Sequence, residues 1–472
     1  MKAAIAIILN KYPELASQLK ANHAFIPEPQ DLKLQCIHID DFSGISLITD
    51  DPLAHHCYCS RAFVRARNGD IVAALGPVTK GYGEYFNNYL GLGLPEYIEI
   101  PVHPKYNQNP FKSLMISEHT IAKLGNKING DSVLLHPYMG HSDAWELARA
   151  LNSKLGVPIK VLAPLPVLTE LVNNRSIFAD MVALILGIPY RLTSFPVANA
   201  TQIATCIVTK FKATDRIALR VVNSATGLGT YMLEPKTRAQ LKPEELQTKI
   251  AVWLKEIQWN NVPYITVECW EPQVLCSPSL QLWIPPAAEG SPIIEGIFDQ
   301  EFDPNNPVQF TGSTTSNLSG VILENLKKDA LKIAQAFQAL GYLGRCSFDL
   351  ILCGTNLANA NYKFVECNGR WGGTSTSMAL MNRLFLNHRE QAYYAKTVNV
   401  PALKGTPFDI IFKYLEPILY NHINATGWLI LHNPSCVKAI GTLDAITLAD
   451  TQQEAIARQK ILLTQLEHFC NA

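Results

Sequence analysis

The chain lacks the long apolar runs, the excess of charge of one sign and the low-complexity tracts that would assign it to several common protein classes. No stretch approaches the roughly twenty consecutive apolar residues that a membrane-spanning helix needs. Forty basic and forty acidic residues cancel, which argues against a surface built for nucleic acid or an anionic membrane. Blocks of like charge, Gly/Ser-rich tracts and evident internal repeats are also missing. We therefore expect an ordinary globular protein with neither nucleic acid nor membrane as a partner.

The eleven cysteines are odd in number and scattered along a chain large enough to bury a core. This usage favours reduced, buried thiols and a cytoplasmic location over a disulfide framework. The segment His55-His-Cys-Tyr-Cys59 is a candidate metal site, but it lacks a second ligand pair at a suitable spacing, so we favour a structural role. The apolar residues 3–9 are short and no cleavage site follows them, so we predict a buried strand there rather than a signal peptide.

At 472 residues the chain exceeds the size at which one hydrophobic core stops growing, which predicts two or three domains. Short apolar runs alternate with helical patterns until two prolines, at 164 and 166, interrupt them. The alternation predicts an open, mainly parallel α/β layer. Its strands are expected at residues 3–9, 34–39, 45–49, 62–65, 71–74, 132–137 and 159–163, with a helix at 142–155. Later strands are expected at 217–222, 231–233, 264–269, 280–284, 293–298 and 428–432, and later helices at 176–186, 244–257, 326–340 and 451–469.

Residues 347–352 and 362–368 are two runs of strand formers around a Gly/Asn-rich connection, which is the pattern of a β-hairpin. Alternation along a strand places Glu366 and Asn368 on one face, and an antiparallel register brings Asp349 opposite Glu366 or one position away. Carboxylate and amide oxygens grouped in this way suit Mg²⁺ that bridges nucleotide phosphates. Buried carboxylates are costly without a cation, and Arg370 follows as a fixed positive charge. The hairpin is therefore predicted to be a metal–nucleotide site.

Three other segments carry weaker signals. The small-residue loop at 224–230 could close its backbone N–H groups over phosphates, although a plain hairpin turn explains it better. Arg220, inside an apolar strand, either extends to water or holds an anion. Arg175, at a helix start, is either an anion-binding residue or a solvated one. Glu268 and Trp270, at the end of a strand, could meet a nucleoside or form an ordinary sheet edge.

The order of these pieces resembles the ATP-grasp superfamily over residues 166–380. The resemblance implies an α/β domain at 1–165, two α+β subdomains at 166–265 and 266–380 that enclose ATP, and a small α/β extension at 381–472. It implies that Arg175 and Arg220 bind the phosphates of ATP, and that a loop with Ser224, Thr226, Gly227 and Gly229 closes over them. It implies that Glu268 and Trp270 contact the nucleoside. Asp349, Glu366 and Asn368 would hold Mg²⁺, and Arg370 and Arg220 would be catalytic. The family usually has lysine at both phosphate positions, whereas both candidates here are arginine, which binds phosphate bidentately but is bulkier.

A closer resemblance is to the pheganomycin-type ATP-grasp peptide ligases. Residues 276–283 look like their second grasp strand, 298–302 like the loop after it, and Glu366-Cys-Asn-Gly-Arg-Trp-Gly-Gly-Thr374 like their Glu-x-Asn-x-Arg-x-Gly-Gly-Thr segment. This implies a ligase that joins a carboxylate to an amine through an acylphosphate. It would use ATP with Mg²⁺, or alternatively Mn²⁺, act on small-molecule or peptide substrates, and have a homodimer as one option for its assembly. A phosphotransferase on the same fold and a non-catalytic nucleotide-binding protein stay open as alternatives.

Overall fold

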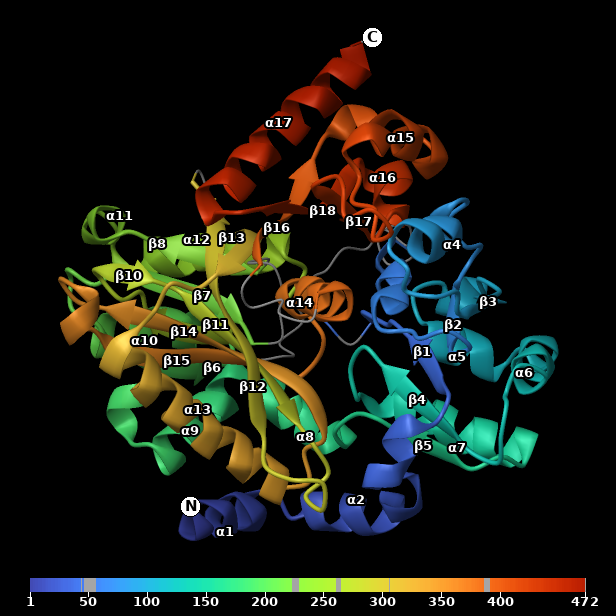
Figure 1. Ribbon diagram of the computed structural model, residues 1–472. Helices are drawn as coiled ribbons and strands as arrows, with labels where there is room; N and C mark the ends of the chain where they lie inside the picture. The colour runs from blue at the N-terminus through green and yellow to red at the C-terminus, as the bar shows by residue number, and fades with distance from the viewer. Residues whose placement is uncertain are drawn as a thin grey trace.

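The computed structural model describes residues 1–471 except 44, 46–56, 223–228, 260–264, 305 and 386–390. Within these residues the strands form three sheets. Figure 1 shows a parallel sheet on the right, two antiparallel sheets on the left and helix α14 (Gly373–Leu384) at the centre between them. The elements that carry the predicted site therefore face the amino-terminal sheet across the middle of the molecule.

The amino-terminal sheet has the strand order β3-β2-β1-β4-β5, and every neighbouring pair is parallel. Its strands are β1 (Cys36–Ile39), β2 (Ile71–Leu75), β3 (Glu96–Ile100), β4 (Val133–Pro137) and β5 (Ile159–Val161). Helices α5 (Pro110–Met115), α6 (Glu118–Gly125) and α7 (Ser142–Leu155) share its core. The predicted parallel α/β layer is confirmed. The strand order reverses between β1 and β4, and open α/β sheets bind ligands beyond the carboxyl ends of the strands at such a point.

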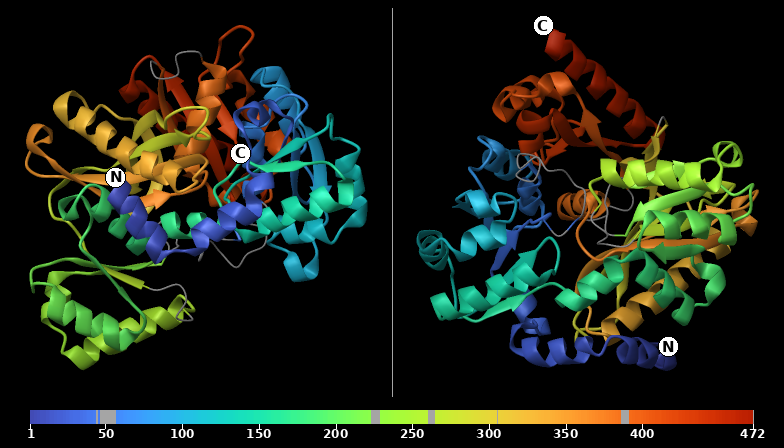
Figure 2. Two further views of the ribbon diagram at one scale, coloured as in Figure 1. Left: turned by 90° about the horizontal axis from the view of Figure 1, so that it is seen from below. Right: turned by 180° about the vertical axis from the view of Figure 1, so that it is seen from behind.

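A four-stranded antiparallel sheet follows, with the order β6-β9-β7-β8. Its strands are β6 (Ser194–Val197), β7 (Ile217–Val221), β8 (Thr230–Leu233) and β9 (Ile265–Cys269). Helices α10 (Ala200–Lys210) and α12 (Pro243–Glu256) pack on it through a core of their own that includes Ile203, Ile250 and Trp253. The left view of Figure 2 shows this unit projecting from the rest of the chain. Arg220 and Glu268 lie on neighbouring strands of this lobe.

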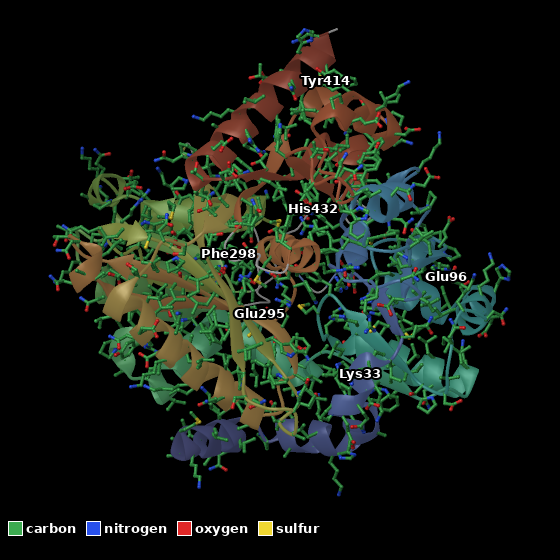
Figure 3. All side chains as sticks on the ribbon, viewed as in Figure 1. Lys33, Glu96, Glu295, Phe298, Tyr414 and His432 are labelled. Carbon is green, nitrogen blue, oxygen red and sulfur yellow. The ribbon has the colours of Figure 1, made fainter. Side chains whose placement is uncertain are left out.

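The third sheet is antiparallel and runs β10-β14-β11-β12-β13-β16-β18-β17, with β15 paired to β14. Its strands are β10 (Val274–Cys276), β11 (Pro278–Ile284), β12 (Ile293–Asp303), β13 (Asn306–Thr315), β14 (Gly344–Cys353), β15 (Asn361–Asn368), β16 (Ala392–Asn399), β17 (Leu429–His432) and β18 (Thr442–Ala449). Glu295 and Phe298, on β12, lie toward the centre of the molecule in Figure 3. Because β16 pairs with β13, the carboxy-terminal strands continue the sheet that carries the hairpin. The domain boundaries at 165 and 380 stay predictions.

The remaining helices surround these sheets. They are α1 (Lys2–Lys11), α2 (Glu14–Asn22), α4 (Tyr82–Glu84), α8 (Pro166–Asn173), α9 (Arg175–Ile185), α11 (Pro235–Ala239), α13 (Gly320–Ala339), α15 (Phe408–Leu415), α16 (Ser435–Ile440) and α17 (Gln452–Asn471). Among the described residues, no helix combines the length and apolar character needed to cross a bilayer. No disulfide forms among the cysteines of the described residues, and each of them is buried or half-buried.

Two of the predicted strands are wrong. Residues 3–9 form helix α1, whose Ala4 and Ile8 lie four residues apart and are both buried, so the short apolar run has a helical period and not an alternating one. Residues 62–65 belong largely to a 3-10 helix, Cys59–Val64, in which Ala62, Phe63 and Val64 are all buried. A continuous apolar run does not distinguish these two structures. The predicted strand at 45–49 falls almost wholly outside the described residues.

Candidate functional site

The predicted hairpin forms from β14 and β15, with Asp349 directly opposite Glu366. Asp349 accepts hydrogen bonds from Ser279 Oγ at 2.5 Å and from Asn368 Nδ2 at 3.0 Å. Arg370 Nη2 donates to Asn368 Oδ1 at 2.8 Å. The structure thus brings together the hairpin residues that the sequence groups at this site. Residues 298–302, predicted as a loop, lie instead within strand β12, where Phe298 is in register with Thr315 and Phe302 with Phe310 of β13.

Burial and like charge shape the electrostatics of the hairpin. Burial, together with the neighbouring Glu366 carboxylate, raises the pKa of Asp349 to about 7. Burial also opposes ionisation of Glu366, but the guanidinium groups of Arg175 and Arg220 outweigh it and lower the pKa of Glu366. Two facing carboxylates with divergent pKa values form a position where a cation is electrostatically favourable.

Two arginines reach this position from other elements. Arg175 is the first residue of α9, whose start is fixed by Asn174 Oδ1 accepting from the backbone N–H groups of Ser176 and Ile177. Its side chain, 7% exposed, forms an ion pair with Glu366. Arg220, on β7, has Nη1 3.6 Å from Glu268 Oε2 on β9. The two predicted phosphate-binding residues therefore lie together beside Glu366 of the hairpin.

Each of these arginines keeps buried hydrogen-bonding capacity. Arg175 Nη1 and Arg220 Nε have no hydrogen-bond partner within the part of the chain that the structure describes. Burial and the nearby Arg175 lower the pKa of Arg220. Buried unpaired donors on neighbouring cations are costly unless an anion meets them. We call Asp349, Glu366, Arg175 and Arg220 the cleft cluster.

The predicted nucleoside-binding residues lie beside this cluster. Glu268 is 6% exposed and accepts a hydrogen bond from Thr266 Oγ1 at 2.8 Å. Trp270 follows β9, and the Arg216 guanidinium lies over its ring, 5.5 Å from the centroid. In the predicted flap, Gly229 has φ of 71°, which favours glycine. Ser224, Thr226 and Gly227 lie outside the described residues.

Three cavities meet at the hairpin, and Glu366 lines all of them. The first, about 340 Å³, lies between β9 and the third sheet and is lined by Arg175, Arg220, Glu268 and Trp270. The second, about 410 Å³, lies beside Arg370 and the start of α14 and has aromatic walls that include Tyr58 and Tyr138. The third, about 500 Å³, opens toward the amino-terminal sheet and is lined by Lys112, His141 and Asp143. We call them the nucleotide cavity, the aromatic cavity and the crevice cavity.

The sequence reasoning missed the crevice residues. Tyr138 and His141 follow β4, and Asp41 follows β1, at the carboxyl ends of the two strands where the sheet order reverses. Met139 forms a β-bridge with Arg370, and Arg370 Nη1 donates to Tyr138 Oη at 3.1 Å. The signal was present, because polar residues directly after two neighbouring buried parallel strands share one sheet edge.

A second charged group lies behind Arg370, around the ring of Trp371. The guanidinium groups of Arg65 and Arg345 lie 5.0 and 4.6 Å from the ring centroids of Trp371. Arg65 forms an ion pair with Asp40, and Arg345 forms one with Glu295. Trp371 Nε1 donates to His136 Nε2 at 3.2 Å. We call these residues the tryptophan cluster; it joins the amino-terminal sheet to the hairpin.

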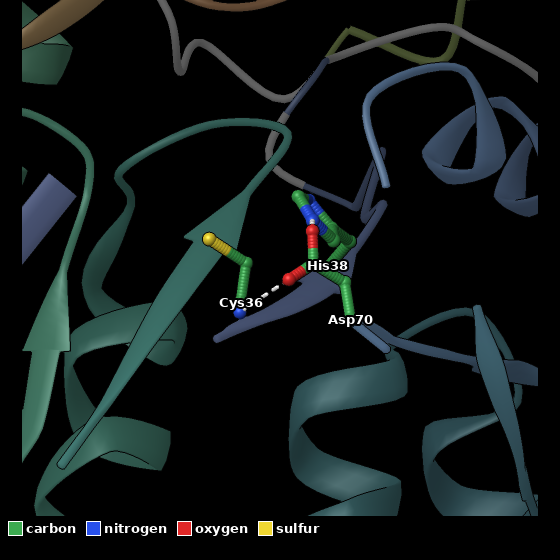
Figure 4. A group of neighbouring side chains, drawn as sticks. All are labelled: Cys36, His38 and Asp70. Atoms are coloured by element: carbon green, nitrogen blue, oxygen red, sulfur yellow. Dashed lines mark hydrogen bonds and ion pairs between the residues drawn. The ribbon is translucent and has the colours of Figure 1, made fainter. Parts of the chain in front are cut away.

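Cys36, His38 and Asp70 form a third buried group with metal-binding residue types (Figure 4). The Asp70 carboxylate accepts from the backbone N–H groups of Cys36, at 2.9 Å, and Arg67, at 2.8 Å, and lies 3.2 Å from His38 Nε2. Arg67 Nη2 also lies 3.6 Å from Cys36 Sγ, and burial raises the pKa of that thiol to about 12. A guanidinium beside a protonated thiol opposes a cation, so we assign the group a structural role that ties β1 to the turn before β2.

Comparisons with solved structures identify the fold. The chain is similar to biotin carboxylase from Campylobacter jejuni, solved with a β,γ-ATP compound, with a TM-score of 0.56 and 12% identity over 92% of both chains. It is similar to N5-carboxyaminoimidazole synthetase from Staphylococcus aureus, solved with ADP, with a TM-score of 0.53 and 10% identity over 91% of this chain and 97% of that one.

The biotin carboxylase domain of Hydrogenobacter thermophilus 2-oxoglutarate carboxylase, solved with MgADP and bicarbonate, gives a TM-score of 0.54 and 11% identity over 90% and 88% of the two chains. No family model matches the chain. No curated protein matches it in sequence. At these identities the similarity establishes the fold, and the predicted arrangement of an α/β domain followed by an ATP-grasp fold is confirmed.

Proposed function

We propose that the protein is an ATP- and Mg²⁺-dependent ligase that joins a carboxylate to an amine, in the manner of the ATP-grasp peptide ligases. The observation that carries this proposal is the meeting of three cavities at one carboxylate-bearing hairpin, with Glu366 lining each. A ligase of this class must hold a nucleotide, a carboxylate and an amine together. The solved structures of similar fold include complexes with ADP and with MgADP.

The nucleotide cavity suits the adenosine and phosphates of ATP. Its walls include the apolar Leu192 and Phe302, and its charged end presents Arg175 and Arg220. Small-molecule pockets of this kind combine an apolar body with a few convergent polar groups. Phosphate oxygens would satisfy Arg175 Nη1 and Arg220 Nε, the two buried donors that lack partners among the described residues.

The hairpin residues fit a divalent cation, because two carboxylates face one another, and burial together with the Glu366 charge raises the pKa of Asp349 to about 7. Bound by Asp349, Glu366 and Asn368, Mg²⁺ would neutralise charge on the phosphates during transfer. The ion pair between Arg175 and Glu366 gives way in this arrangement, because the arginine exchanges its carboxylate for a phosphate. After the exchange, Arg175 would be paired with a phosphate and Glu366 with Mg²⁺, so neither charge would be left buried without a partner.

The aromatic cavity suits the carboxylate substrate. Arg61 lines it and is fixed by Asp444, whose Oδ2 lies 3.0 Å from Arg61 Nη2, and Arg370 lines it from the hairpin side. A carboxylate oxygen held there attacks the γ-phosphorus of ATP, ADP leaves, and an acylphosphate forms. Arg370 and Arg220 stabilise the charge of the phosphoryl group as it transfers. An amine then attacks the acyl carbon, and inorganic phosphate leaves.

The test is ADP release from the full-length protein with MgATP, screened against pools of amino acids and acidic metabolites. A ligase releases ADP with a carboxylate and an amine together and forms an amide that mass spectrometry detects. Phosphate transfer without any amine would instead establish a phosphotransferase. Tight MgATP binding without ADP release from any pool would establish a nucleotide-binding protein, the function that the direct Arg175–Glu366 ion pair favours as a second candidate.

A further inference from the structure

His141 lines the crevice cavity and pairs with the buried Asp41, and the phosphoryl-transfer chemistry does not use this pair. His141 Nε2 lies 2.8 Å from Asp41 Oδ2, and the two side chains are 12% and 0% exposed. Asp41 also accepts hydrogen bonds from the backbone N–H and the Oγ of Ser43, both at 2.8 Å. The carboxylate is therefore fixed in place by short contacts, and it orients the imidazole ring.

We propose that His141 is the general base that takes the proton from the attacking amine, that Asp41 is its positioning residue, and that the crevice cavity is where the amine binds. This inference rests on the proposed ligase function and adds to it the identity of the base and the entry side of the amine. The observation behind it is that His141 lines the same cavity as Glu366, Asn368 and Arg370.

The ring nitrogens of His141 have separate roles in this arrangement. The Asp41 carboxylate, 2.8 Å from Nε2, electrostatically favours the proton of the neutral ring on Nε2, although the contact lacks hydrogen-bond geometry, and Nδ1 then keeps the lone pair. The side chain of His141 does not cap helix α7, although the residue occupies the N-cap position. Phe111 packs beside the ring with the centroids 5.3 Å apart. In the proposed arrangement, Nδ1 is the nitrogen that accepts the proton of the amine.

The charges around His141 favour a base that works near neutral pH. Burial opposes the imidazolium, but the contact with Asp41, helped by Asp143 at the start of α7, outweighs it and raises the pKa of His141. Lys112, on α5, acts in the opposite direction and lies 3.1 Å from Asp143 Oδ2. A general base is most effective when its pKa lies near the working pH.

In the proposed step, His141 accepts a proton while the amine displaces phosphate. The amine nitrogen forms a bond to the acyl carbon of the acylphosphate, and a proton on that nitrogen passes to His141 Nδ1. The bond between the acyl carbon and the phosphate oxygen then breaks, and inorganic phosphate leaves with the electron pair. The imidazolium finally releases its proton to water. Asp41 stabilises the imidazolium while it lasts.

The test compares two nucleophiles on the carboxylate that the ADP-release screen identifies. Glycinamide is largely protonated at neutral pH and needs a base, whereas hydroxylamine is largely unprotonated and traps acylphosphates without one. For His141→Gln we expect amide formation with glycinamide to fall about 10²–10⁴-fold, and hydroxamate formation to change less than about threefold. For Asp41→Asn we expect about a tenfold loss with glycinamide and no loss with hydroxylamine. His119→Gln, an exposed histidine on α6, is the matched control.

Two further measurements separate a base from a structural residue. In the wild type, the rate with glycinamide should rise with pH through the raised pKa of His141, and this inflection should vanish in His141→Gln. NMR of ¹³C-labelled histidine should show one resonance, absent from His141→Gln, whose pKa lies above 6.5 in the wild type and falls in Asp41→Asn. MgATP affinity by calorimetry should stay within twofold in every variant.

The outcomes are distinct. Equal losses with both nucleophiles would overturn the assignment of His141 as the base while leaving the ligase function in place. An unchanged rate with glycinamide would overturn it too. Absence of ADP release by the wild type with either nucleophile would remove the proposed function, and the base with it.

Discussion

The cleft cluster and the tryptophan cluster contain the same charged residue types, arginine with aspartate or glutamate, and use them for different ends. In the tryptophan cluster, two guanidinium groups lie against one indole ring, and each has its own carboxylate. In the cleft cluster, two guanidinium groups and two carboxylates line cavities. The burial of Trp371 suits a structural network, whereas the cavities around Glu366 leave space for the proposed ligands.

This difference shows why buried charge alone does not locate function. Removing one partner of a buried ion pair costs several kcal/mol where the other partner stays dry. Where a cavity admits water or ligand, the same removal changes binding more than folding. Variants of matched residues in the two clusters should therefore separate activity from stability.

The largest expected effect is on the hairpin. Asn368→Ala should lower Mg²⁺-dependent ATP turnover at least about 10²-fold, because it removes a metal ligand and the residue that orients Arg370. Asn361→Ala, at the exposed far end of the same strand, is the control and should leave turnover within twofold. ADP release and the melting temperature report the two properties. Equal turnover in both variants would contradict the metal assignment.

The tryptophan cluster should respond in the opposite way. Trp371→Leu should lower the free energy of unfolding by about 3 kcal/mol, because it empties the space between two cations and frees His136. Trp270→Leu makes the matching change beside the nucleotide cavity and should cost less than about 1 kcal/mol while weakening MgATP binding. Urea unfolding and calorimetry measure these effects. Similar stability losses in the two variants would remove the distinction between the clusters.

A smaller effect is expected for the phosphate-binding arginines. Arg220→Met should weaken MgATP binding about 10–100-fold, because it removes a buried donor directed at the phosphates. The free energy of unfolding should change little, because the loss of one of two neighbouring guanidinium groups also removes the repulsion between them. Arg191→Met is the control, because Arg191 pairs with Asp180 at the surface, with Nη1 2.7 Å from Oδ1. Unchanged affinity in Arg220→Met would contradict the assignment of the nucleotide cavity.

The smallest effect is a pH dependence of stability. Burial and the nearby Arg65 lower the pKa of His136 well below 6.5 in the folded chain, so the unfolded chain binds the extra proton as the pH falls below about 6.5. The free energy of unfolding should therefore fall by about 2 kcal/mol between pH 7 and pH 5 through this residue. His136→Gln keeps an acceptor for Trp371 and should reduce that slope. An identical slope in wild type and variant would show that His136 does not contribute.

Local sequence was sufficient to predict the hairpin and its facing residues, but it was insufficient to predict the residues of the crevice. The register of Asp349 and Glu366 follows from alternation along two adjacent strands. Helix α7 was bounded correctly because its pattern is long and Gly156 ends it with φ of 67°. The run at residues 3–9 is too short for its period to decide between helix and strand.

The contacts of Trp371 could not be predicted, because its partners Arg65 and His136 lie more than two hundred residues earlier and no local pattern links them. The same holds for β16, which pairs with β13 across helices α13 and α14 and the hairpin. The positions of Asp41 and His141 were predictable only in part. Each follows a correctly predicted strand, but their proximity depends on the strand order, which the sequence did not specify.

The β-bridge between Met139 and Arg370 bears on the biosynthesis of the chain. Arg370 is separated by 232 residues from its partner Tyr138, so at ~5–20 residues per second the amino-terminal segment waits ~10–50 s for the residue that completes the crevice. Until then Met139 and Tyr138, at the carboxyl edge of the parallel sheet, lack their contacts with Arg370. A nascent chain can thus fold its first sheet early, yet it completes the crevice only after Arg370 has been synthesised.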